Sequence, residues 1–222
     1  GRLVTEGVQN TLIGARCGDA ITTGGYNVLL GMETGSYSVN LTTGSDNVLI
    51  GAYSHTSAAD TARAMVLGYN VTGTTDYTTI GNGANDIRAA HGNITWATVS
   101  DERYKKDIVD STAGLSFINA LQPRTFKYKT LGELPETFNA YEADSTKVFK
   151  NSNTNHGFIA QEVKAAIDAD SSIKDGFKLW GERPDGGQEI AEAALIPILV
   201  KAIQEQNALI EALTARVATL EG

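Results

Sequence analysis

Short apolar runs, each closed by a glycine, recur through the first half of the chain. The clearest copies are Asn10–Gly14, Asn27–Gly31 and Asn47–Gly51, and looser copies stand at Met65–Gly68 and Thr78–Gly81. The closing glycines follow one another at intervals of 17, 20, 17 and 13 residues. Runs rich in Val, Leu and Ile predict strands, and a glycine at the end permits a sharp bend. Strands this short are not stable alone, so the pattern predicts a β-solenoid in which successive strands stack.

The apolar core that such a repeat can enclose is thin. We therefore expect residues 1–99 to form a trimeric β-solenoid-like shaft in which three chains share a core around an axis. The alternative is a disordered Gly/Ser/Thr linker, which the regular Val/Leu/Ile runs argue against, because true linkers lack them.

The second half changes to the patterns of a mixed α+β unit. We expect helices at 114–121 and 158–167, a strand at 124–129, an irregular excursion at 132–155 and a hairpin tip at 183–187. Ser111 is the predicted N-cap of the first helix and Pro123 its stop. In the second helix, Ile159, Val163 and Ile167 lie on one apolar face.

The last thirty residues carry a heptad pattern. Apolar residues alternate at spacings of three and four along a seam of Ile196, Leu199, Ile203, Gln206, Ile210, Leu213, Val217 and Leu220. This predicts a coiled coil over about 196–221, with Pro197 in the first helical turn and Gln206 fixing the register. Ile or Val alternating with Leu along the seam favours a parallel dimer, whereas the solenoid favours a trimer, and the sequence leaves this conflict open.

Composition divides the chain at Ser100. Residues 1–99 contain no lysine, 4 arginines and 15 of the 23 glycines, so 14 of the 18 Lys and Arg follow later. The domains predicted are thus 1–99 and 100–222.

A net charge of −8 without a basic stripe argues against nucleic-acid binding. We also expect no membrane insertion, a packed role for the single cysteine, Cys17, and a longer parent protein upstream of Gly1.

The candidate chemistry lies at the same junction, where Ser100 precedes Lys105 by five residues. A serine becomes a nucleophile when a base takes its proton, and a lysine serves as that base once desolvation or cationic neighbours favour its neutral form. Arg103 and Lys106 are such neighbours. The alternative is structural, with Ser100 capping a helix whose first turn holds Asp101 and Glu102.

Three motifs resemble the C-terminal intramolecular chaperone domain of bacteriophage tail fibres and tailspikes, of the endosialidase type, classed as peptidase family S74. They are Ser100-Asp101-x-Arg103-x-Lys105-x-x-Ile108, Gly157-Phe158-Ile159-Ala160-Gln161-Glu162-Val163, and Leu195–Glu205 leading into the coiled coil. The resemblance covers about 98–222. It implies a domain that trimerises the chain, guides folding of the shaft and removes itself by autoproteolysis adjacent to Ser100.

The family's serine and lysine map onto Ser100 and Lys105. We expect support from Asp101, Arg103, His156, Gln161 and Glu162, no metal and no cofactor, and a place in the virion tail fibre or spike. Tyr26, Tyr37, Tyr53 and Tyr69 could contact a host-surface glycan or protein.

Three other functions stay open. One is a structural or receptor-binding trimeric fibre tip that is never cut, although the intact Ser100/Lys105 pair argues against it. Another is the head of a bacterial trimeric autotransporter adhesin, which uses similar repeats but ends in a membrane-anchoring segment. The third is a hydrolase acting on outside substrates, for which the repeats suggest no pocket.

Overall fold

A computed structural model describes residues 2–93, 95–173 and 177–222. The chain divides into two compact units, Gly1–Asp107 and Ile108–Gly222, which we call the solenoid unit and the C-terminal unit. The expected boundary at 99/100 stays a prediction.

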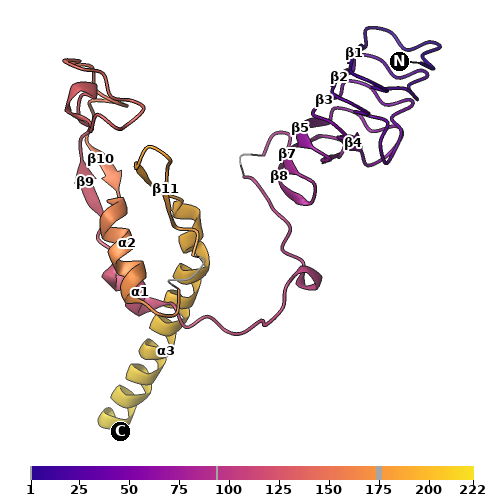
Figure 1. The fold of residues 1–222 in the computed structure, drawn as a ribbon. Coiled ribbons are helices and arrows are strands. Elements are labelled where there is room, and N and C mark those ends of the chain that lie inside the picture. The colour runs from indigo at the N-terminus through magenta and orange to yellow at the C-terminus, as the bar shows by residue number, and fades with distance from the viewer. Residues whose placement is uncertain (1, 94, 174–176) are drawn as a thin grey trace. The chain divides into compact units, whose positions relative to one another are not determined.

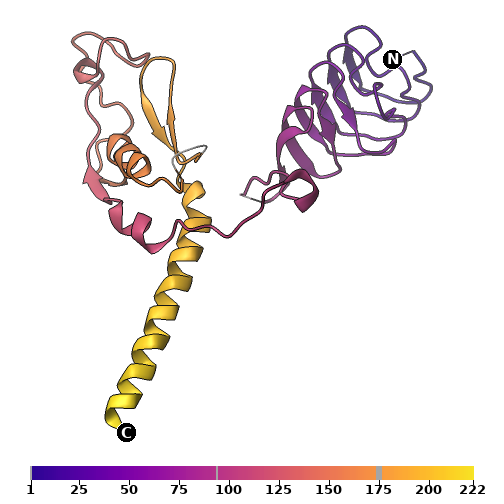
Figure 2. The same ribbon diagram turned by 60° about the horizontal axis from the view of Figure 1, so that its bottom comes forward.

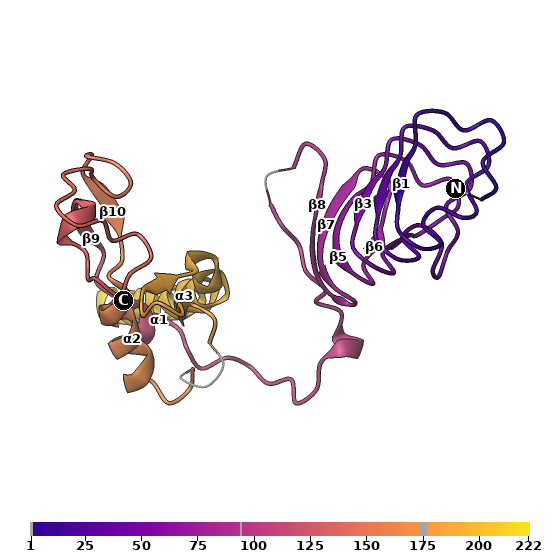
Figure 3. The same cartoon turned by 45° about the horizontal axis from the view of Figure 1, so that its top comes forward.

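The solenoid unit is a stack of short strands joined by long turns (Figure 1). Parallel pairing runs through β1 (Thr11–Ile13), β2 (Val28–Leu30), β3 (Val48–Ile50), β5 (Met65–Tyr69) and β7 (Tyr77–Asn82), and β8 (Asn85–Ala90) closes the sheet as an antiparallel hairpin with β7. A second parallel pair joins β4 (His55–Thr56) to β6 (Thr72–Gly73). Figure 3 shows the strands following one another as successive rungs. The prediction of a β-solenoid is confirmed.

Each repeated run sends its middle residue inward and its neighbours outward. Leu12, Leu29, Leu49, Val66 and Thr79 occupy one register position, and the last four of these are buried. The outward position is held in the same register by Ile13, Leu30, Ile50, Leu67, Ile80 and Ile87. All six are exposed, and we call them the apolar stripe.

Polar side chains bind the rungs together beside this core. Asn27 Nδ2 donates to Asn10 Oδ1 at 3.0 Å, and Asn47 Nδ2 donates to Asn27 Oδ1 at 2.9 Å. Asn27 and Asn47 are fully buried, and each also donates to a backbone carbonyl of the following turn. This asparagine ladder satisfies buried groups that water cannot reach. It ends at Ala64, whose N–H donates to Asn47 Oδ1 but whose side chain passes nothing on.

The closing glycines are required by geometry. Gly14, Gly31, Gly51 and Gly68 have φ between 127° and 145°, which side chains rarely allow. At Gly51 a Cβ would also collide with the carbonyl group of Gly68 on the next rung. Cys17 is buried in the core, as expected; its Sγ donates to the Leu29 carbonyl, and burial raises the pKa of the thiol.

The C-terminal unit packs three helices with two small antiparallel sheets (Figure 2). Its elements in order are α1 (Leu115–Ala120), β9 (Arg124–Phe126), η2 (Leu131–Glu133), β10 (Asn155–Gly157), α2 (Ala160–Ala169), β11 (Trp180–Glu182), β12 (Gln188–Ile190), η3 (Glu192–Leu195) and α3 (Ile196–Glu221). Strand β9 pairs with β10, and β11 with β12 around the expected tip at 183–187. The core contains Phe117, Val163, Ile167, Leu179 and Ile198.

Two local expectations need correction. Ser111 does not cap α1: the N-cap is Gly114, and the Leu115 N–H is accepted by Glu205 Oε2 of α3 at 2.8 Å. A carboxylate ninety residues away thus replaces the local serine. The strand predicted over 124–129 ends at Phe126, because its partner β10 offers only three residues.

The long helix α3 is confirmed, with Pro197 in its first turn. It has two different faces. Ile198 and Ala202 are buried within the C-terminal unit, whereas the apolar members of the predicted seam are 42–80% exposed. The heptad seam is therefore not used for packing inside the chain.

Candidate active site

A single 3-10 turn, η1 (Glu102–Tyr104), organises the segment that follows Ser100. Asp101 caps this turn, because its side chain accepts a hydrogen bond from the Arg103 N–H at 2.9 Å. At the other end the Lys105 N–H donates to the Glu102 carbonyl at 2.9 Å. This tight turn brings the side chains of residues 100 and 105 together.

Lys105 Nζ donates to Ser100 Oγ at 2.7 Å. Both side chains are exposed in the single chain. The donor in this arrangement is the amine, so the lysine acts as a base only when it is neutral and accepts the hydroxyl proton over the same contact. The structure thus brings the predicted nucleophile and base within hydrogen-bonding reach.

Asp101 and Arg103 form a separate pair. The Arg103 guanidinium donates to both carboxylate oxygens of Asp101, at 2.9 and 2.7 Å. The side-chain bond from Arg103, helped by its backbone N–H, lowers the pKa of the Asp101 carboxyl. Arg103 is therefore engaged with a carboxylate, which weakens the expectation that its charge acts on Lys105. The alternative, in which Ser100 caps a helix, is wrong, because Asp101 is the cap of this turn.

The other predicted supporting residues lie in the C-terminal unit. His156 is in β10, and Gln161 and Glu162 are in the first turn of α2. Glu162 accepts two hydrogen bonds from Arg124 of β9, at 3.0 and 2.8 Å, and this lowers the pKa of its carboxyl. Glu162 thus holds α2 to β9, and the supporting roles of these three residues stay predictions.

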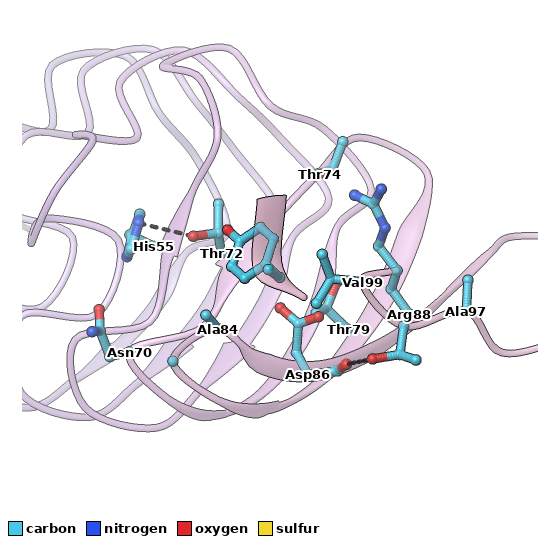
Figure 4. A pocket seen from close by; sticks show the side chains of 13 residues that line it. His55, Asn70, Thr72, Thr74, Thr79, Ala84, Asp86, Arg88, Ala97 and Val99 are labelled. Carbon is cyan, nitrogen blue, oxygen red and sulfur yellow. Dashed lines mark hydrogen bonds between the residues drawn. The ribbon is translucent and has the colours of Figure 1, made fainter. Parts of the chain in front are cut away.

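A cavity of about 560 Å³ opens at the last rung of the solenoid (Figure 4). Its lining includes Thr79, Asp86, Val99 and Tyr104, and the last two directly precede Ser100 and Lys105. The Thr79 hydroxyl is buried and has no hydrogen-bond partner among the described residues. Sequence reasoning missed this cavity. The available signal was Thr79 itself, a hydroxyl at the inward position where earlier rungs have Leu or Val.

Aromatic side chains stack along one edge of the solenoid. The ring centroids of Tyr37 and Tyr53 are 4.7 Å apart, and those of Tyr53 and Tyr69 are 5.5 Å apart. Tyr37 and Tyr69 are about half exposed (50% and 52%). We call these three residues the tyrosine row. Tyr26 is exposed as well.

Two features are absent from the residues that the structure describes. No group of three or more His, Cys, Asp or Glu side chains in this part of the chain is placed to hold a metal ion. None of the described helices is long and apolar enough to cross a membrane.

Comparison with known proteins gives one match. The model of family Peptidase S74, described as chaperone of endosialidase, matches residues 100–171. Searches of curated proteins and of solved structures found no match. The matched region begins at Ser100, contains η1, α1, β9, η2, β10 and α2, and ends before β11, β12, η3 and α3. Residues 100–171 therefore match the Peptidase S74 chaperone family, the family that the three sequence motifs resemble.

Proposed function

We propose that residues 100–222 trimerise and fold the shaft of a phage tail fibre or spike, and then release it by autoproteolysis adjacent to Ser100. Ser100 is the nucleophile and Lys105 the general base. The observation that carries this proposal is the 2.7 Å contact between Lys105 Nζ and Ser100 Oγ, at the first residue of the family match.

The reaction begins when neutral Lys105 takes the hydroxyl proton of Ser100. Ser100 Oγ then attacks the carbonyl carbon of Val99, either in its own chain or in a neighbouring one. An Oγ–C ester forms, the C–N bond breaks, and the nitrogen of Ser100 leaves with a proton returned by Lys105. Water hydrolyses the ester, which yields the Val99 carboxylate and restores the serine hydroxyl. Backbone N–H groups near the site stabilise the oxyanion.

Assembly supplies the switch for this chemistry. In the single chain the side chain of Lys105 is exposed to water. Packing of three chains around the site removes that water and favours the neutral amine. Cleavage consequently follows assembly rather than preceding it.

Two exposed rows of apolar side chains support the proposal that copies of this chain bind one another. One is the seam of α3, and the other is the apolar stripe of the solenoid. The apolar members of both are exposed in the single chain, and Gln206 is the one polar residue of the seam. Contiguous exposed apolar surface of this kind marks an interaction site.

A trimeric coiled coil also explains the chaperone role. Joining three chains at α3 raises the effective concentration of their shafts and aligns them in one register. Pairing between distant segments is slow, so this alignment helps the shaft most. Once the chaperone has been cut away, the shaft cannot return to a state that refolds, which gives it kinetic stability.

The test is the intact mass of the freshly purified chain beside Ser100→Ala and Lys105→Ala. We expect two fragments meeting at Ser100 in the wild type and a whole chain in both variants. Lys106→Ala and Ser111→Ala are matched controls, because they remove a neighbouring lysine and a second serine of the linker, by which we mean the segment between β8 and α1. Both variants should still be cut. The cleavage rate should rise with pH, since the base must be neutral.

Other outcomes would change the proposal. A wild type that trimerises and stays whole after prolonged incubation leaves a permanent trimerising tip without peptidase activity. Cleavage in Lys105→Ala at the wild-type rate would remove lysine from the mechanism while keeping the serine.

A second function, contact with a host-surface glycan, is favoured by the tyrosine row. Exposed aromatic rings offer flat apolar faces beside polar hydroxyls, which suit sugar rings. Binding of the uncut Ser100→Ala chain to a panel of bacterial surface polysaccharides should be lost in Tyr53→Ala and retained in Tyr104→Ala. Equal binding by both would place the contact elsewhere.

A further inference from the structure

The residues just before Ser100 are bound to the last strand of the solenoid. The Ala97 N–H donates to the Arg88 carbonyl at 2.7 Å, and the Arg88 N–H donates to the Ala97 carbonyl at 2.8 Å. The two residues thus form an antiparallel bridge between β8 and the linker. One residue later, Thr98 Oγ1 donates to the Asp86 carbonyl at 3.1 Å.

We propose that β8 positions the bond to be cut, by holding residues 97 and 98 as a short added strand that presents Val99 and Ser100. This inference rests on the proposed autoproteolysis. Arg88 and Asp86 contribute through their backbone carbonyl and N–H groups, so they and Thr98 are positioning residues and do not touch the reacting atoms.

The geometry resembles the way that an extended peptide is bound by adding a strand to a sheet edge. Main-chain hydrogen bonds fix the direction of the peptide and leave the following residue free to react. Three hydrogen bonds over two residues restrict the backbone before Ser100, while η1 restricts it afterwards. The 99–100 peptide is therefore held from both sides, which is the entropic condition for a fast intramolecular attack.

The cavity beside this segment supports the same conclusion. Val99 lines it together with Thr79 and Asp86, from the last two strands of the solenoid (Figure 4). The inward column of the solenoid ends there at Thr79, so the side chain of Val99 lies at the open end of the core. The last two strands of the solenoid thus line the cavity beside the proposed cut.

This arrangement makes cleavage depend on the folded state of the shaft. Within the sheet, β8 pairs with β7, and β7 in turn pairs with β5. When these last rungs are not formed, residues 97 and 98 have no strand to join. Release is then slow until the end of the shaft has folded.

The test compares cleavage rates of full-length variants by intact mass over time. Ala97→Pro removes the N–H that donates to Arg88, and we expect cleavage to slow by roughly tenfold. Thr98→Val removes the hydroxyl donor and should slow cleavage by about two- to tenfold, whereas Thr98→Ser should restore the rate. Val109→Pro and Thr95→Val are matched controls, because they alter linker residues outside the added strand.

A positioning role also predicts that the rate falls by the same factor at every pH, because Lys105 is unchanged. Wild-type rates in Ala97→Pro and Thr98→Val, while Ser100→Ala stays whole, would overturn this inference and keep the proposed function. If Thr98→Ser were cut as slowly as Thr98→Val, the hydroxyl would not be the group that positions the bond, and the inference would be wrong on this point. A wild type that is never cut overturns both proposals together.

Discussion

The solenoid unit and the C-terminal unit are stabilised in different ways. In the solenoid, the first rungs repeat one another's contacts, and each buried asparagine bonds to the neighbouring rungs. In the C-terminal unit, key contacts join residues far apart in sequence, such as Glu205 and Leu115. The comparison shows that one chain can combine a periodic, locally determined body with a unit whose folding depends on long-range contacts.

The two units also share one property. Each leaves apolar side chains exposed in a regular row, the apolar stripe on the solenoid and the seam on α3. Both rows are therefore expected to be buried by other copies of the chain. The experiments below separate stability that belongs to one chain from stability that needs its partners.

The largest effect on a single unit is expected from the asparagine ladder. Asn27→Ala removes two donated and two accepted side-chain hydrogen bonds and leaves the Gly44 carbonyl and the Asn47 N–H without partners. We expect the solenoid to lose about 2–5 kcal/mol of unfolding free energy. Urea unfolding followed by hydrogen exchange of β1 to β5 measures this loss.

The control for this experiment is Asn40→Ala, an exposed asparagine on the same unit. It should change the free energy by less than about 0.5 kcal/mol. A similar small change in Asn27→Ala would mean that the ladder adds nothing beyond the apolar core.

The second experiment addresses the seam of α3. Leu213→Glu places a charge on the 62% exposed seam residue, and we expect the assembled form to be lost at micromolar concentration. Ala215→Glu puts the same charge on the same helix away from the seam and should leave assembly intact. Analytical ultracentrifugation reports the mass of each. Equal masses for the two variants would show that the seam does not join chains, and a wild-type mass of two or three chains resolves the open choice between dimer and trimer.

How far the sequence predicted these features depends on how local their causes are. The strands of the solenoid were predictable because every run carries its own apolar residues and its own closing glycine. The register of the strands was not predicted from the sequence; in the structure a one-residue slip would turn Leu29 and Leu49 outward. The heptad helix was predictable for the same reason, because its pattern is written in eight seam positions.

The features that the sequence did not predict depend on contacts between residues far apart in the chain. The cap of α1 was assigned to Ser111 because it is nearby, but Glu205 occupies that place from α3. The bond between Thr98 and Asp86 was invisible, because β8 carries no glycine-closed run and was not predicted. Ser100 and Lys105 were found through a motif and their spacing, and only η1 shows how a five-residue separation becomes a 2.7 Å contact.

The smallest expected effect tests one of these long-range contacts. Glu205→Ala removes the acceptor of the Leu115 N–H, and the loss of a helix cap costs about 1 kcal/mol. Hydrogen exchange at the start of α1 should then become roughly fivefold faster. Glu205→Gln is the matched control, because it keeps a side-chain oxygen for the Leu115 N–H and loses only the charge that faces Lys201 at 3.7 Å. That ion pair is partly exposed and should matter little.

If the Glu205→Gln and Glu205→Ala variants exchange equally fast, the carboxylate charge rather than the cap holds α1. If neither differs from the wild type, α1 is held by Phe117 and the core alone, and the C-terminal unit is less dependent on this distant contact than the comparison with the solenoid implies.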